Sequence, residues 1–296
     1  MQGTENHDYA MERRLRTMDP ELHRRFTDAV FALQYNLNSY RLIFPEWTDH
    51  SNLHSMTVID FCNKLIGDQI DRLNADEMYI LLMGCYFHDT GMGITHNDFL
   101  EFSSQIDFGN YFDTHRREDV SRVIRDFHNE FSGRFIRKYA ELFEIPSEKH
   151  LFAVMQIARG HRKTDLMSEK EYPAAMPVPG GNTICLPYLA ALIRLADEID
   201  VAAARNPKLL YDIECLTDEV QIIENRKLKA VRELMITEDE FILQTDPTDA
   251  DILSRVREVA AKMQKTLDLC RRVTERRTPF VITQRRVRLQ VIDASD

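Results

Sequence analysis

Residues Tyr79–Ile94 read YILLMGCYFHDTGMGI, and this stretch decides how the rest of the chain is organised. Residues 80–87 are apolar or small on every side of a helix, which predicts a helix that is buried all round rather than amphipathic. The helix ends at His88 and Asp89, and the glycines that follow let the backbone turn beneath them. An unpaired carboxylate is too costly to keep charged in a protein interior, so a divalent metal ion is a suitable partner. Taken alone, the pair could also be a capping histidine followed by a solvated aspartate.

The composition of the chain indicates which kinds of partner and which cellular compartment to expect. The 296-residue chain has a net charge of −10, which argues against a broad surface for duplex nucleic acid and leaves a small anionic ligand open. The N-terminal residues MQGTENHDYAMERRLR lack the apolar core of a signal peptide, and no apolar run approaches the roughly 20 residues that cross a membrane. The five cysteines are scattered without a CxxC spacing, which is typical of reduced core residues. We therefore expect a cytoplasmic protein without a membrane segment.

Helical spacing of apolar residues predicts further helices on both sides of the central one. They cover residues 20–40, 52–73, 116–142, 147–162 and about 187–205. Two irregular stretches, 90–115 and 163–186, are expected to be loops that flank a site.

The last part of the chain has a different pattern. Residues 231–236 and 240–244 alternate like a hairpin, a long helix begins near 248, and residues 287–291 alternate as a final strand. The expected fold is therefore mainly α, a helical bundle with a small C-terminal α+β subdomain. We expect an N-terminal helical segment over 1–45, a central domain over 46–210 and the subdomain over 211–296.

Several polar residues lie on or beside the apolar faces of the expected helices. The inward set is His54, His88, Asp89, His128, His161 and Asp197. One such histidine alone is more often a core residue than a ligand, but four on four different helices are not a coincidence. The mixture of imidazole and carboxylate suits Mn, Fe, Ni, Zn or Mg, and the lack of cysteine argues against a structural zinc site. Six ligands exceed what one catalytic metal takes, so two ions bridged by Asp89 are expected.

The remaining histidines have no such placement. His7, His23, His96, His115 and His150 are expected on the surface or in loops.

In order along the chain, these residues resemble the HD-domain superfamily of metal-dependent phosphohydrolases. His54 in LHSMTV, His88–Asp89 in YFHDTGM and Asp197 in IRLADEID match the H…HD…D motif. His128 in IRDFHNEFS and His161 in IARGHRK resemble the additional ligands of the binuclear branch. The match is similar to bacterial HD modules that are often joined to a GHKL-type ATPase, and it covers about residues 47–205.

The resemblance implies a fold and a reaction. It implies an HD-domain bundle in which His88 and Asp89 are catalytic, with His54, His88, Asp89 and Asp197 on one ion and Asp89, His128 and His161 on the other. The reaction implied is hydrolysis of a phosphate ester or anhydride in a nucleotide or other small phosphorylated substrate. The absence of a GYP motif leaves cyclic dinucleotide specificity unsupported.

Other residues beside these ligands have two interpretations each. Arg162, Lys163 and Arg205 could bind substrate phosphates or form surface ion pairs. Asp200 could orient a ligand histidine or Arg205, and His50 could approach the metals as an outer partner, although capping of the next helix is the simpler role.

Two other functions stay open at this point. One is a nucleotide-sensing module that regulates a partner or fused ATPase. The other is a diiron oxygenase, because the HD fold also supports that chemistry. The chain could also form a homo-oligomer, whichever function it has.

Overall fold

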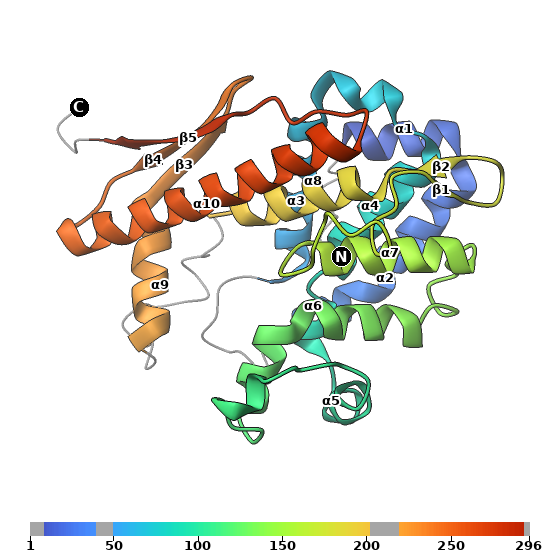
Figure 1. Cartoon of the computed structure of the whole chain (residues 1–296), viewed down its shortest axis with the longest axis horizontal. Helices are drawn as coiled ribbons and strands as arrows, with labels where there is room; N and C mark the ends of the chain where they lie inside the picture. Colours follow the sequence, from blue (N-terminus) through green and yellow to red (C-terminus); the bar gives the residue numbers. More distant parts are fainter. Residues whose placement is uncertain (1–8, 40–49, 202–218, 293–296) are drawn as a thin grey trace, which may run out of the picture.

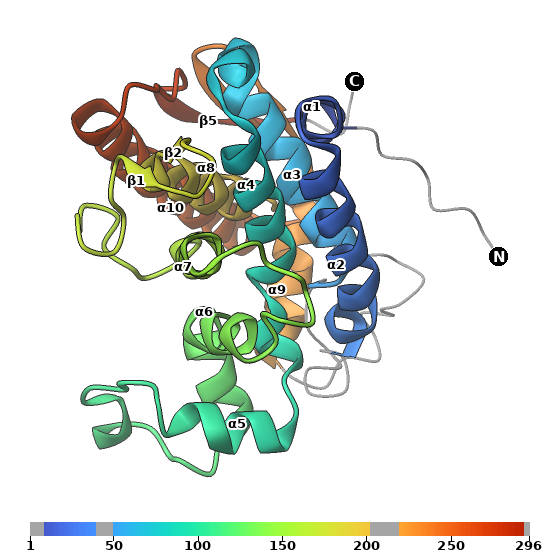
Figure 2. The ribbon, with the colours of Figure 1, turned by 90° about the vertical axis from the view of Figure 1, so that its right-hand side faces the viewer.

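A computed structural model describes residues 9–39, 50–201 and 219–292, and within them it is mainly helical (Figures 1 and 2). The N-terminal and central helices, with three 3₁₀ turns among them, are α1 (Ala10–Met18), α2 (Pro20–Ser39), α3 (Asn52–Ile66), η2 (Gly67–Arg72), α4 (Ala75–Phe87), η3 (Thr90–Gly93), α5 (His96–Ser103), η4 (Tyr111–Asp113), α6 (Val120–Lys138) and α7 (Glu148–Gly160). The remaining elements are β1 (Met176–Pro177), β2 (Thr183–Ile184), α8 (Leu186–Ile199), α9 (Glu219–Ala230), β3 (Val231–Ile236), β4 (Glu240–Thr245), α10 (Ala250–Arg277) and β5 (Arg286–Val291). The expected fold class, a mainly α bundle with a small α+β part, is confirmed.

Helix α4 is the central element, as expected. All of its residues are buried, because α1, α2, α3, α7 and α8 all pack against it. Its first turn is held by a capping box, in which the Asn74 side chain accepts a hydrogen bond from the Glu77 amide and the Glu77 carboxylate accepts one from the Asn74 amide. A helix that is apolar on every side is stable only when other helices cover it completely, as they do here.

Two buried carboxylates in the first turn of α4 fix the start of two other helices. Asp76 Oδ1 lies 2.7 Å from Nε2 of His150, in the first turn of α7, and Asp76 Oδ2 accepts a hydrogen bond from Asn182. Glu77 Oε1 accepts a hydrogen bond from the amide of Cys185, the N-cap of α8. The amino ends of α4, α7 and α8 therefore lie together, and the three helices run in the same direction.

The C-terminal part packs on the bundle through α10. This long helix lies along α8 on one side and against β5 on another (Figure 1). The sheet has the order β3-β4-β5, with β3 antiparallel and β5 parallel to β4. The expected hairpin, long helix and final strand are thus present, and the parallel pairing of β5 follows from the crossover through α10.

Some elements differ from the expectations. Helices α1 and α9 are additional, and their charged sequences carry few buried residues to mark them. The 90–115 stretch is not irregular throughout, because Thr95 and Asp98 form a capping box that starts α5. Helix α6 is shorter than expected and is broken at Phe127, which has non-helical dihedral angles.

One histidine was assigned wrongly. His150 was expected at the surface, but it is 3% exposed and pairs with Asp76. The sequence gives no sign of this contact, since the two residues lie 74 positions apart.

The described cysteines agree with the expectation of reduced core residues. Cys62, Cys85, Cys185 and Cys270 are all buried and free. Within the described ranges, the helices are too short or too polar for any of them to cross a membrane.

Replacing Asp76 with alanine is expected to destabilise the fold by about 1–3 kcal/mol at neutral pH, because His150 and Asn182 lose their shared acceptor. Burial opposes ionisation of Asp76, but the hydrogen bonds from His150 and Asn182 outweigh it and hold the pKa of Asp76 below its usual value. The part of the unfolding free energy that depends on the negative charge of Asp76 is fully present above about pH 4, the ordinary pKa of an aspartate. It is lost as the pH falls through the lowered pKa that Asp76 has in the folded protein.

Urea unfolding at several pH values measures this difference, and the exposed Asp68 provides the control as Asp68→Ala. Equal unfolding free energies for Asp76→Ala and Asp68→Ala at pH 7 would contradict the structural role of Asp76.

Candidate metal centre

Six polar side chains meet where the carboxyl ends of α4, α7 and α8 lie together. His88 is the C-cap of α4 and His161 is the C-cap of α7. Asp89 follows His88, and Asp197 lies in the last turn of α8. His54 from α3 and His128 from α6 complete the group. The structure therefore brings together all six residues that the sequence singled out as ligands.

Hydrogen bonds at Nδ1 fix the orientation of the histidine rings. In His88, His128 and His161, Nδ1 lies 2.8, 2.7 and 2.6 Å from the carbonyl oxygen three residues earlier. A carbonyl oxygen only accepts hydrogen bonds, so each Nδ1 carries the proton and each Nε2 presents a lone pair. His54 is held in the same way, with its Nδ1 2.6 Å from Oδ2 of Asp200.

The Nε2 atoms form two close pairs. They are 3.1 Å apart in His54 and His88, and 2.8 Å apart in His128 and His161. Two lone pairs at this distance repel each other unless a cation lies between them. Two ligands bound to one ion at about 2.1 Å lie roughly 3 Å apart, so each pair fits one divalent ion.

Asp89 lies between the two pairs. Its Oδ2 is 3.3 Å from Nε2 of His88 and 3.5 Å from Nε2 of His54. Its Oδ1 is 3.3 Å from Nε2 of His128 and 4.0 Å from Nε2 of His161. The carboxylate thus offers one oxygen to each pair.

Asp197 adds a second carboxylate to the first pair only. Its Oδ1 is 3.2 Å from Nε2 of His54 and 4.0 Å from Nε2 of His88. Among the described residues, His54, His88 and Asp197 form one group whose ligand atoms could hold a metal, and Asp89, His128 and His161 form another.

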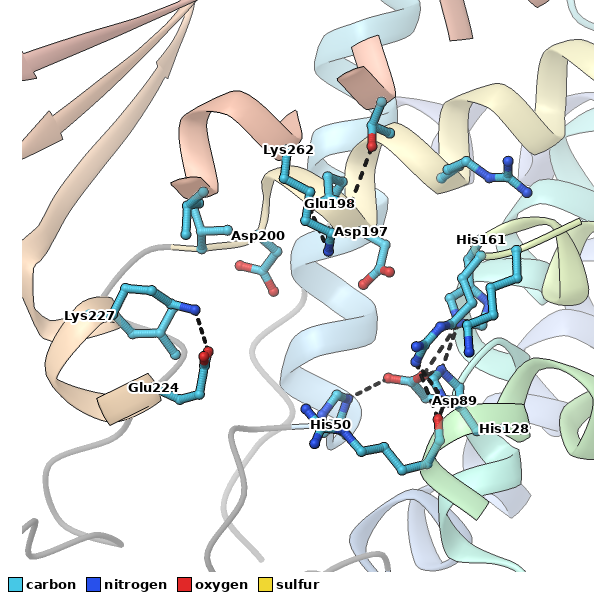
Figure 3. Close-up of a pocket in the computed structure, with 18 of the residues that line it drawn as sticks. His50, Asp89, His128, His161, Asp197, Glu198, Asp200, Glu224, Lys227 and Lys262 are labelled. Carbon is cyan, nitrogen blue, oxygen red and sulfur yellow. Dashed lines mark hydrogen bonds and ion pairs between the residues drawn. The ribbon is translucent and has the colours of Figure 1, made fainter. Parts of the chain in front are cut away.

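His50 does not cap the next helix, so that interpretation was wrong. The N-cap of α3 is Ser51, whose hydroxyl accepts a hydrogen bond from the Leu53 amide. His50 Nδ1 instead lies 2.7 Å from Asp89 Oδ2 (Figure 3). His50, His54 and Asp89 form a third group that could hold a metal.

The electrostatics favour a metal ion over a proton. Burial lowers the pKa of His128 well below its usual value and that of His161 to about 4. Burial would raise the pKa of Asp89, but the neighbouring His88 and His50 rings outweigh it and hold the pKa well below its usual value. Burial would likewise raise the pKa of Asp197, but the contact with His54 and the nearby histidine rings outweigh it, and the pKa is lowered. Neutral imidazoles and ionised carboxylates are the forms that bind metals.

The helix dipoles also favour a cation at this site. The carboxyl ends of α4, α7 and α8 carry the negative ends of their dipoles, which favour a cation nearby.

Close packing of α6 on the turn after Asp89 positions His128. The Ser132 hydroxyl donates a hydrogen bond to the His88 carbonyl and accepts one from the Gly91 amide. A Cβ at Gly91 would lie 2.2 Å from the His128 carbonyl oxygen, so only glycine fits there.

Buried Arg194 fixes the chain after His161. Its Nε donates to the Gly160 carbonyl at 2.7 Å and its Nη2 donates to the Thr164 carbonyl at 2.9 Å. The guanidinium thereby satisfies the carboxyl end of α7 and joins it to α8.

A cavity of about 570 Å³ opens from this candidate metal centre. Arg162 and Lys163 line it, whereas Arg205 lies outside the described residues. Besides Arg194, further charged residues in its wall were not singled out from the sequence: Arg125, Glu198, Glu224, Lys227 and Lys262. Of these five, only Glu198 lies within a quoted motif, IRLADEID.

Replacing Gly91 with alanine is expected to destabilise the protein by about 1–3 kcal/mol or more, because backbone atoms of α6 would have to move. The shift would also move His128 away from Asp89, so affinity for divalent ions should fall. Thermal unfolding and metal titration measure the two effects.

The control is Gly133→Ala on the same helix, where the new Cβ would meet only the side chain of Arg159. A Gly91→Ala protein as stable as the Gly133→Ala protein, with unchanged metal affinity, would contradict this account.

The comparison with protein families agrees with the geometry. The HD-CE family model matches residues 44–278, which include all the ligand candidates described above. No curated protein matches the chain. The match covers well over half of the sequence, and the resemblance inferred from the motifs is thereby confirmed: the chain belongs to the HD-CE family of HD-type domains.

Proposed function

We propose that this protein is a metal-dependent phosphohydrolase that cleaves a phosphate ester or anhydride of a nucleotide at a centre of two divalent ions. The observation that supports this most is the placement of Asp89, whose two oxygens face two separate pairs of histidine Nε2 atoms. A carboxylate that faces two ligand pairs is suited to bridge two ions.

The ligand roles follow from the two groups. His54, His88, Asp89 and Asp197 would hold one ion, and Asp89, His128 and His161 would hold the other. Such a pair of ions, when bound, activates water as a nucleophile and neutralises charge on a phosphoryl oxygen. Asp200 keeps the His54 ring in the tautomer that presents Nε2 to the centre.

Two cations beside the centre support an anionic substrate. Arg162 Nη1 contacts the Arg125 carbonyl at 3.3 Å, and Lys163 Nζ contacts the Asp126 carbonyl at 2.9 Å. Within the described ranges neither is within 4 Å of a carboxylate oxygen, so the alternative of surface ion pairing has no support there. Both charges remain available to a phosphate in the cavity.

Metal content should distinguish the two groups. Protein purified without chelator is expected to carry about two equivalents of divalent metal. Asp89→Ala should lose most of both, because it removes the shared ligand, whereas His128→Ala should retain about one. Elemental analysis measures the content, with His115→Ala as a control outside the centre. Unchanged metal in Asp89→Ala would overturn the assignment.

The reaction itself is tested by a screen of nucleotides with Mn²⁺, Mg²⁺, Ni²⁺ and Fe²⁺, run both in the absence and in the presence of oxygen. We expect phosphate release or ester cleavage that falls at least about 100-fold in His88→Ala. Turnover that requires oxygen would instead indicate an oxygenase. Tight binding of a nucleotide that stays chemically unchanged with every metal would indicate a sensing module.

Arg162→Met is expected to raise KM for the best substrate about tenfold with a smaller change in kcat, because a charge-assisted contact to phosphate is lost in both ground and transition states. Exposed Lys170, which is not among the cavity residues, supplies the control as Lys170→Met. Equal kinetics for the two variants would rule out a substrate contact at Arg162.

A further inference from the structure

The far wall of the cavity is made by the C-terminal subdomain. Glu224 and Lys227 come from α9, and Lys262 and Thr266 come from α10. Figure 3 shows Glu224 and Lys227 across the cavity from Asp89 and His128. This wall is separate from the metal ligands and has no role in the chemistry described above.

The wall carries two ion pairs at its polar positions. Lys227 pairs with Glu224 one turn away on α9, and only 16% of the Lys227 side chain is exposed. Lys262 Nζ lies 3.0 Å from Glu198, which also accepts a hydrogen bond from Thr266 at 3.3 Å. Each pair therefore presents a hydrogen-bond donor and an acceptor side by side.

Apolar side chains occupy the space around these pairs. They line the same cavity and belong to the end of α8 and to α9, β3 and α10: Val201, Leu228, Val231, Val259 and Leu269. A ligand that reaches this wall meets an apolar surface interrupted by neutral donor and acceptor pairs.

The two ends of the cavity thus differ in charge. At the metal end, Arg162 and Lys163 have no carboxylate partner within the described ranges. At the far wall, Lys227 and Lys262 are each neutralised by a carboxylate. One end suits an anion, and the other suits an uncharged group.

We propose that α9, α10 and the end of α8 form a recognition wall, defined by Glu224, Lys227, Lys262 and Glu198, that binds the base of a nucleotide while its phosphate lies at the metal centre. This inference rests on the proposed function. A base has an apolar face for the valine and leucine side chains and an edge of donors and acceptors for the two ion pairs. The cavity volume of about 570 Å³ lies within the range of small-molecule sites.

Other ligand classes fit this wall less well. A second phosphate would have to compete with Glu224 and Glu198 for the Lys227 and Lys262 ammonium groups. An acyl chain would bury both ion pairs without hydrogen-bond partners, which is costly. A sugar would place hydroxyl groups against the apolar side chains.

The test compares ligands that differ only in the base. Adenosine, guanosine, cytidine and uridine 5′-methylenephosphonates cannot be hydrolysed at their P–C bond, and ribose 5-methylenephosphonate lacks the base. Calorimetric titration of the metal-loaded protein gives each Kd. Lys227→Met and Glu224→Gln are the test variants, and Lys229→Met, an exposed residue on the same helix, is the matched control.

We expect wild-type protein to bind at least one nucleoside phosphonate more than tenfold tighter than the ribose probe. Lys227→Met should weaken that nucleoside about tenfold and the ribose probe less than twofold, since one charge-assisted hydrogen bond is lost. Glu224→Gln should change the order of preference among the four bases, because it replaces a carboxylate, which only accepts hydrogen bonds, with an amide, which both donates and accepts them. Lys229→Met should change neither.

Equal affinity of wild-type protein for nucleoside and ribose probes would overturn the recognition wall, as would equal weakening of both by Lys227→Met. If the ribose probe still binds and is weakened by Arg162→Met, the metal end is intact and only the recognition wall fails. If no probe binds wild-type protein, the proposed function itself is overturned.

Discussion

The lone pairs of four histidine Nε2 atoms, aimed at the buried carboxylate of Asp89, are the constraint on which this structure depends. Three of the rings are fixed because Nδ1 donates to a carbonyl of their own helix, and the fourth is fixed by Asp200. Acceptors gathered in this way repel one another in the protein interior, and burial makes protonation of His128 and His161 unfavourable. A bound divalent ion would remove this repulsion.

The fold tolerates this cluster because the rest of the bundle is rigid. Helices α4, α7 and α8 are tied at their amino ends by Asp76 and Glu77, and Arg194 joins the carboxyl end of α7 to α8. The ligands therefore sit at the ends of helices that are fixed at both ends. Metal sites need this kind of support, because small displacements of a ligand weaken binding strongly.

Charge is distributed unevenly over the cavity, although the chain as a whole is acidic. Arg162 and Lys163, which have no carboxylate partner within the described ranges, lie beside the histidines, and the paired charges lie on α9, α10 and the end of α8. The overall charge of −10 is therefore a poor guide to what the site binds. Local pairing, rather than the net charge of the chain, sets the charge that each wall of the cavity presents.

The sequence by itself determined the helical class, the buried central helix and the six inward polar residues, because hydrophobic period and local motifs are properties of neighbouring positions. It did not reveal the Asp76–His150 pair, the contact of His50 with Asp89, or helices α1 and α9. Glu224, Lys227 and Lys262 carry no motif, and only the packing of α9 and α10 over the cavity brings them opposite the metal centre. Contacts between residues far apart in sequence depend on how whole elements pack, and that is decided by the tertiary structure.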